Sequence, residues 1–195
     1  MRVPSLPGLL VLLTALSLVP VVSQAGLIGQ TLSAEYYYPT HSTSYPGALF
    51  SPSSFTVGPD QETVGDVEGV TQLFVDFTST ALAVNFRTVL SDPTWTGSAF
   101  NGIMFTSLLP NGITGAAVDE STSIAGFDSS RVSFTASEIF LNWQGLSYLD
   151  GQNVKINFAF APTFAVDLTS VPEPVTLALL GAGLAGLGFA RRKLH

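Results

Sequence analysis

Cysteine is absent from all 195 residues of the chain. No disulfide framework supports the fold, and thiol catalysis and cysteine-ligated metal sites are excluded. Stability must therefore come from a hydrophobic core. Residues 26–170 are long enough to bury one and to form a single domain.

Positive charge is scarce between the two ends of the chain. Residues 26–170 hold three cations, Arg87, Arg131 and Lys155, against thirteen carboxylates, which gives a formal charge of −10. This balance opposes nucleic-acid binding, which needs cationic contacts to phosphate. It also opposes electrostatic adhesion to anionic lipid, and it favours solubility.

Histidine is rare as well, and His41 is the only one in residues 26–170. A serine triad needs a histidine base and an orienting acid that converge in space, and no Gly-x-Ser-x-Gly motif occurs. We interpret His41 as a solvent-exposed loop residue. We expect no catalytic residue, no cofactor and no bound metal, and hence a protein that is not an enzyme.

The carboxylates leave two alternatives open. Glycoside hydrolysis needs two acids at a defined separation, and calcium is bound by oxygen ligands. The candidate acids for hydrolysis are Asp119, Glu120, Glu138 and Asp150. The candidate calcium ligands are Asp60, Glu62, Asp66 and Glu68, whose spacing departs from that of an EF-hand loop. We interpret both sets as solvated turn and loop residues.

Helix-forming patterns are few, whereas residues that favour strands are abundant. Several segments alternate with period two, which is typical of strands with one buried face. The residues predicted to face inward are Leu73, Val75 and Phe77 in 70–78, Leu82, Val84 and Phe86 in 80–90, and Val154, Ile156, Phe158 and Phe160 in 153–161. Eight to ten short strands predict an all-β fold, a single β-sandwich or jelly-roll-like domain over residues 26–170.

Turn residues separate these predicted strands. Asp150-Gly151 predicts a hairpin between residues 139–148 and 153–161. The segment 78–80 predicts a tight link between two strands. Residues 36–46, rich in Tyr, Ser and Thr, are expected to form a loop, and 52–69 an irregular acidic stretch.

Two tryptophans have different predicted roles. Trp143 shares strand spacing with Ile139 and Leu141, which favours a place in the core. Trp95 lies between Pro93 and Gly97, in a loop-like setting. It is the candidate for contact with a sugar ring, together with loop tyrosines.

The N-terminus has the features of a secretory signal peptide. Arg2 precedes a mostly apolar run, residues 9–22, and Ser23 and Ala25 place small residues at the −3 and −1 positions. We expect cleavage after Ala25, which gives residues 1–25 as the signal peptide. Export follows from this prediction.

The C-terminal segment, residues 171–195, contains three blocks in order. The blocks are Val171-Pro172-Glu173-Pro174, the uncharged run 175–190 and Arg191-Arg192-Lys193. The two prolines keep the first block extended. The run is expected to form a transmembrane helix, because a backbone in lipid must bond internally. With 16 residues it is shorter than the roughly 20 of a typical span, and the basic block stops transfer.

In this order at the chain end, residues 171–193 resemble the PEP-CTERM sorting signal of Gram-negative bacteria. The resemblance implies an exosortase as the processing partner, acting at the Pro-Glu-Pro motif. It also implies passage through the inner membrane to the cell envelope or extracellular matrix. A permanent C-terminal anchor with a proline-rich stalk is the alternative. A Gram-positive sortase signal is disfavoured, because no LPxTG sequence occurs.

These observations leave the role of residues 26–170 open among three hypotheses. The first is a non-catalytic surface or matrix protein with an unspecified ligand. The second is a carbohydrate-binding module that acts on exopolysaccharide through Trp95 and loop tyrosines. The third is a hydrolase with paired acids.

Overall fold

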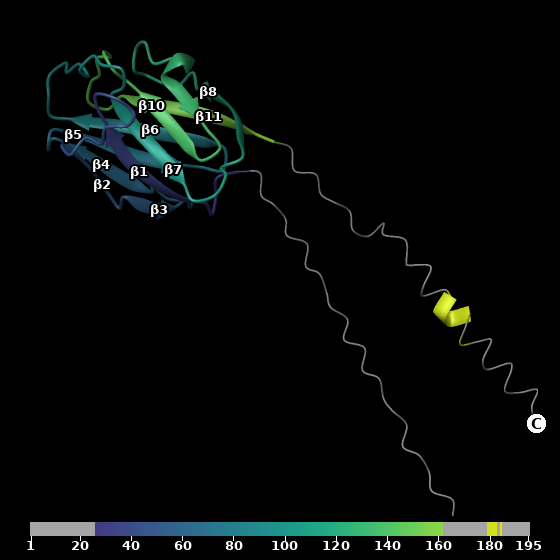
Figure 1. Ribbon diagram of the computed structural model, residues 1–195. Helices are drawn as coiled ribbons and strands as arrows, with labels where there is room; N and C mark the ends of the chain where they lie inside the picture. The colour runs from purple at the N-terminus through teal and green to yellow at the C-terminus, as the bar shows by residue number, and fades with distance from the viewer. Residues whose placement is uncertain (1–25, 162–178, 183, 185–195) are drawn as a thin grey trace, which may run out of the picture. The chain divides into compact units, whose positions relative to one another are not determined.

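The computed structural model describes residues 26–161, together with 179–182 and 184 (Figure 1). The chain divides into two compact units, Met1–Thr163 and Phe164–His195, and all described strands belong to the first. In the second unit, the five described residues are helical and exposed. The limits of the signal peptide and of the sorting segment stay predictions.

The first unit, here called the body, is built from two antiparallel sheets. The first sheet has the order β3 (Ser54–Thr56), β1 (Thr31–Tyr37), β7 (Gly102–Ser107), β10 (Glu138–Asn142) and β9 (Val132–Phe134). The second has the order β2 (Ala48–Ser51), β4 (Thr63–Val67), β5 (Thr71–Phe77), β6 (Ala81–Thr88), β11 (Asn153–Phe160) and β8 (Ile113–Val118). A short 3₁₀ turn, η1 (Ser129–Arg131), precedes β9.

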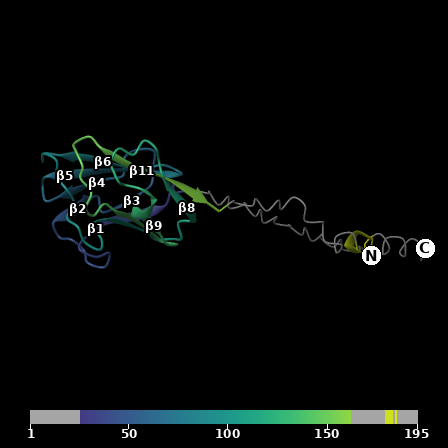
Figure 2. The same ribbon diagram turned by 90° about the horizontal axis from the view of Figure 1, so that it is seen from above.

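The inward faces of the two sheets share one core. Figure 2 shows β1, β3 and β9 on one side of this core and β5, β6 and β11 on the other. Phe77 of β5 crosses between the layers, with its ring centroid 6.1 Å from that of Phe55 and 5.1 Å from that of Phe105. The prediction of an all-β fold is confirmed.

Period-two alternation predicted the buried faces of three central strands correctly. The predicted inward residues of β5 and β6 are all buried. In β11, Val154, Ile156 and Phe158 are buried as well, and Phe160 at the strand end is half-buried. The predicted tight link joins β5 to β6, where the Oγ1 atom of Thr78 accepts a hydrogen bond from the Ala81 amide at 3.0 Å.

The predicted hairpin at Asp150-Gly151 is wrong. β10 ends at Asn142 and pairs in the first sheet, whereas β11 pairs with β6 and β8 in the second. The chain changes sheets after Trp143, where Gly145 has a φ of +70°. Such a positive φ favours glycine. Asp150-Gly151 does form a turn, but its partner is β6: the Gly151 amide donates to the Phe86 carbonyl at 2.9 Å.

Two predicted loops also contain strands. Tyr36 and Tyr37 belong to β1, and residues 52–69 contain β3 and β4. Gly65 conceals the alternation in β4, because it stands where an inward apolar side chain is expected. The Phe50 ring lies over this glycine, and an added Cβ would stand 2.6 Å from its Cε1 atom. The side chain that covers this position therefore comes from the neighbouring strand.

Candidate functional site

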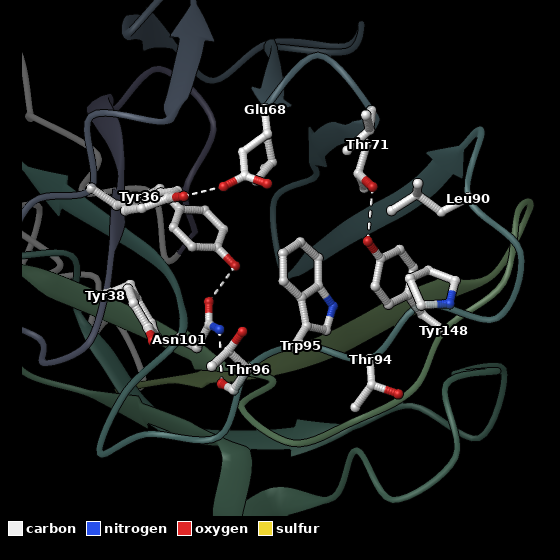
Figure 3. A pocket seen from close by; sticks show the side chains of 14 residues that line it. Tyr36, Tyr38, Glu68, Thr71, Leu90, Thr94, Trp95, Thr96, Asn101 and Tyr148 are labelled. Carbon is white, nitrogen blue, oxygen red and sulfur yellow. Dashed lines mark hydrogen bonds between the residues drawn. The ribbon is translucent and has the colours of Figure 1, made fainter.

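A pocket of about 340 Å³ opens at one end of the body (Figure 3). It lies where β1 ends, beside the turn between β4 and β5 and the connection from β6 to β7. Its aromatic lining residues are Tyr36, Tyr38, Tyr45, Trp95 and Tyr148. Its polar lining residues include Glu68, Thr71, Thr94, Thr96 and Asn101. Both sheets contribute residues, so the pocket exists only in the folded body.

The deep wall of the pocket is fixed by buried hydrogen bonds. The Tyr36 hydroxyl donates to Asn101 Oδ1 at 2.7 Å and accepts from Trp143 Nε1 at 2.7 Å. The Asn101 amide nitrogen donates in turn to the Thr96 carbonyl at 2.9 Å. Burial raises the pKa of the Tyr36 phenol well above its usual value, so this hydroxyl keeps its proton. Satisfied buried networks of this kind hold their members in one arrangement.

A second hydrogen-bonded group, of three hydroxyls, supports the opposite wall. The Tyr148 hydroxyl lies 2.8 Å from Thr71 Oγ1, which is 2.9 Å from Thr88 Oγ1. Burial raises the pKa of the Tyr148 phenol. The two walls are therefore built from neutral hydroxyl and amide groups.

The rim carries the exposed polar and aromatic groups. Tyr45 donates its hydroxyl hydrogen bond to the Glu68 carboxylate, and this bond raises the pKa of the Tyr45 phenol. Tyr38 packs edge-on against Tyr45, with centroids 5.7 Å apart. Glu68 is held in position by a turn in which it and Gly69 both have positive φ, 55° and 69°. Tyr38 and Tyr45 are half-buried and leave ring surface free at the pocket.

Trp95 lies in the expected connection and lines the pocket, but it is only 8% exposed and belongs to the core. Tyr148 stacks on its ring at 4.7 Å, and Trp143 lies 5.7 Å away. Too little of the indole is exposed for a sugar to stack on it. Within the described residues its Nε1 atom has no hydrogen-bond partner. Tyr38 and Tyr45, which the sequence placed only in a general tyrosine run, are the aromatic groups that the pocket exposes.

None of the candidate acids for hydrolysis lines the pocket, and they lie in three separate places: Asp119 and Glu120 together after β8, Glu138 in β10 and Asp150 before β11. Asp119 follows β8 and accepts hydrogen bonds from Ser121 and Asn157, which hold its pKa well below the usual value. Glu138 begins β10. Asp150 Oδ1 accepts from the Thr88 amide at 3.0 Å. Asp119 and Asp150 thus each have a local hydrogen-bond partner.

His41 and the candidate calcium ligands do not form a cluster either. His41 is exposed and lies near Phe140, with ring centroids 6.3 Å apart. Glu62 is buried and accepts from the amides of Gly58 at 3.0 Å and Phe77 at 2.6 Å. In the part of the chain that the structure describes, no group of three or more acidic or histidine side chains is placed to hold a metal ion.

The predicted sorting and cleavage residues lie outside the described ranges. They are Ala25, Val171, Pro172, Glu173, Pro174, Arg191, Arg192 and Lys193. Among residues 26–161 and the helical residues 179–182 and 184, no helix is both long and apolar enough to cross a membrane. The transmembrane helix at 175–190 stays a prediction, because most of this range is not described.

Comparison with known families identifies the C-terminal segment. Residues 170–193 match the PEP-CTERM protein-sorting motif. No curated protein and no solved structure matches the chain. The chain therefore carries a PEP-CTERM signal, which implies export, association with the membrane during sorting and processing by an exosortase.

Proposed function

We propose that this chain is a cell-surface or extracellular-matrix protein of a Gram-negative bacterium, and that its β-sandwich body is not catalytic. The signal peptide exports the chain, the C-terminal segment holds it at the inner membrane, and an exosortase then releases it. The PEP-CTERM match at residues 170–193 carries this proposal. The absence of the candidate acids from the lining of the pocket and the exposure of His41 support a non-catalytic body.

A fusion experiment tests the sorting step. Residues 170–195 are attached to an unrelated periplasmic protein in cells with and without an exosortase, and mass spectrometry identifies the C-terminus. We expect the basic block to be lost only where the exosortase is present. A matched fusion with Pro172→Ala and Pro174→Ala keeps the apolar run and the basic block and is expected to stay intact. An intact wild-type tail in competent cells would contradict release and favour a permanent anchor.

One observation supports a second function, the binding of a sugar chain in the pocket. The half-buried rings of Tyr38 and Tyr45 flank a polar opening of about 340 Å³. This volume is at the lower end for small-molecule sites, so a short segment of a polysaccharide is the appropriate size. Glu68 on the rim disfavours an anionic sugar, because like charges repel. We therefore propose a neutral segment of an exopolysaccharide as the ligand.

Adjacent tyrosines of one segment provide the test. Tyr38→Ala removes an exposed ring at the pocket, and we expect it to weaken binding to neutral glycans by about 10-fold or more. Tyr37→Ala is the matched control, because Tyr37 does not line the pocket. Glycan-array screening followed by calorimetry measures both. Equal loss in the two variants, or no neutral glycan bound by the wild type, would contradict the proposal.

A further inference from the structure

Three large aliphatic side chains are exposed together at one end of the body. Leu108 and Leu109, in the turn between β7 and β8, are 80% and 73% exposed, and Ile28 is 41% exposed. The Gln30 side chain joins their two segments by donating to the Asn111 carbonyl at 3.2 Å. We call Ile28, Leu108 and Leu109 the apolar tip.

The turn that carries the two leucines is well ordered by hydrogen bonds. Asn111 is 2% exposed, donates to the Thr135 carbonyl at 3.2 Å and accepts from the Ile113 amide at 3.0 Å. The Ser107 hydroxyl donates to the Leu109 carbonyl. These hydrogen bonds fix the backbone of the turn, so the two leucines are held at the surface and the entropy cost of ordering that backbone is already met by folding.

Both ends of the described body lie beside this tip (Figure 1). The Gly26 carbonyl accepts from the Gln30 side chain at 3.0 Å. At the other end, Phe160 pairs with Ile113 at the start of β8, and Ala161 follows. The described body therefore ends, at Ala161, next to the apolar tip.

The surroundings of the tip carry few charges. The segments that meet at this end are 26–30, 57–62, 78–80, 107–112 and 135–138. They contain no cation and three carboxylates: the exposed Asp60, the buried Glu62 and the half-buried Glu138, which accepts a hydrogen bond from the Thr135 hydroxyl. Although the charge of the whole body opposes adhesion to anionic lipid, little charge has to be desolvated at this end.

The pocket end also exposes aliphatic residues, but in a different setting. They are Val89, Leu90 and Leu149. The exposed carboxylates at this end are Glu68, Asp92 and Asp150. Burying this end in an apolar phase would place charged carboxylates there as well, at a high cost in free energy. The tip end therefore carries fewer exposed carboxylates than the pocket end, although both ends expose aliphatic side chains.

The length of chain beyond the body limits its distance from the membrane. Thirteen residues, 162–174, separate the last described residue of the body from the predicted apolar run. Fully extended, they span at most roughly 45 Å. While the tail is in the membrane, this tether keeps the tip at a high effective concentration near the lipid. A weak contact is therefore enough to hold the tip at the bilayer surface.

We propose that the apolar tip inserts into the interfacial region of the lipid bilayer while the C-terminal segment holds the chain at the membrane. The inference rests on the proposed function, because it requires the tail to enter the membrane. Transfer of aliphatic side chains from water to that depth of the bilayer is favourable in free energy. The contact places the pocket at the end of the body that points away from the membrane.

The absence of cysteine makes a direct test possible. Leu109→Cys is labelled with an environment-sensitive fluorophore, and Val89→Cys, 82% exposed in the wild type, is the matched control at the other end. The full chain, produced without an exosortase, is reconstituted in phosphatidylcholine vesicles with and without spin-labelled lipid. We expect emission at position 109 to shift to shorter wavelength and to be quenched by the spin label several-fold more than at position 89.

Each other outcome contradicts a different part of the inference. A chain that pellets with vesicles but shows equal quenching at both positions would overturn the lipid contact alone. A shift at position 109 without quenching would assign the tip to a second copy of the chain instead. Failure to pellet would contradict membrane entry of the tail, and the inference with it. In support, Leu108→Ser with Leu109→Ser should abolish quenching of a probe at Ile28→Cys while leaving pelleting unchanged.

Discussion

Replacing Trp143 by alanine is expected to lower the free energy of unfolding by about 3–5 kcal/mol. The indole is fully buried, and Phe86 and Trp95 lie around it with centroids 5.3 and 5.7 Å away. Its Nε1 atom also donates to the Tyr36 hydroxyl. The loss is a large fraction of the stability of a typical domain, about 5–15 kcal/mol. Urea unfolding followed by fluorescence of Trp95, the remaining tryptophan, measures it.

Two milder variants separate packing from hydrogen bonding at this position. Trp143→Phe keeps an aromatic ring but removes the N–H donor, and we expect a loss of about 1–2 kcal/mol. Tyr36→Phe keeps the ring and leaves Trp143 Nε1 and Asn101 Oδ1 without their partner, with a loss of about 1–3 kcal/mol. A Trp143→Ala loss no larger than that of Trp143→Phe would contradict a core role for the indole. The deep wall of the pocket is formed by the same groups. The variants therefore also test whether the pocket keeps its structure when the core beneath it is altered.

Local patterns in the sequence predicted the central strands, because burial there follows simple alternation. Leu73, Val75 and Phe77 face the core as their period-two spacing indicates, and Trp143 is buried as its spacing from Leu141 indicates. The sorting signal could also be predicted from local sequence, since its three blocks are contiguous and can be identified without knowledge of the fold. Each of these features is encoded by residues that are neighbours in the sequence.

The pocket could not be predicted from local sequence patterns, because its residues come from distant segments. Tyr38, Glu68, Trp95 and Tyr148 meet only after β1 has paired with β7 and the two sheets have packed. The tyrosine run did indicate aromatic surface. Which tyrosine faces the pocket depends on the register of β1, where a shift of one residue exchanges the faces. The Asp150-Gly151 dipeptide failed for a related reason: it specifies a turn, but not which strands the turn joins.

Gly102 is a residue whose local sequence pattern suggests a turn but whose role is a tertiary contact. An Asn-Gly pair such as Asn101-Gly102 is typical of a turn or a bulge, yet Gly102 begins β7 and pairs with Tyr37 on one side and Asn142 on the other. A Cβ built on this residue would lie 1.8 Å from the Leu141 carbonyl oxygen of β10. The glycine is therefore required by the close approach of two strands.

Gly102→Ala is expected to destabilise the body by about 3 kcal/mol or more, because β7 and β10 must separate locally to admit the methyl group. In an ordinary strand position the same change stabilises by about 0.5–1 kcal/mol, because alanine restricts the unfolded chain. Gly115→Ala in β8 is the matched control, since its Cβ would meet Ala159 Cβ at an ordinary 3.5 Å. Urea unfolding should therefore give opposite signs for the two variants. Equal effects would mean that strand geometry at Gly102 tolerates a side chain, and that the wall of the pocket at Asn101 is less constrained than its hydrogen bonds indicate.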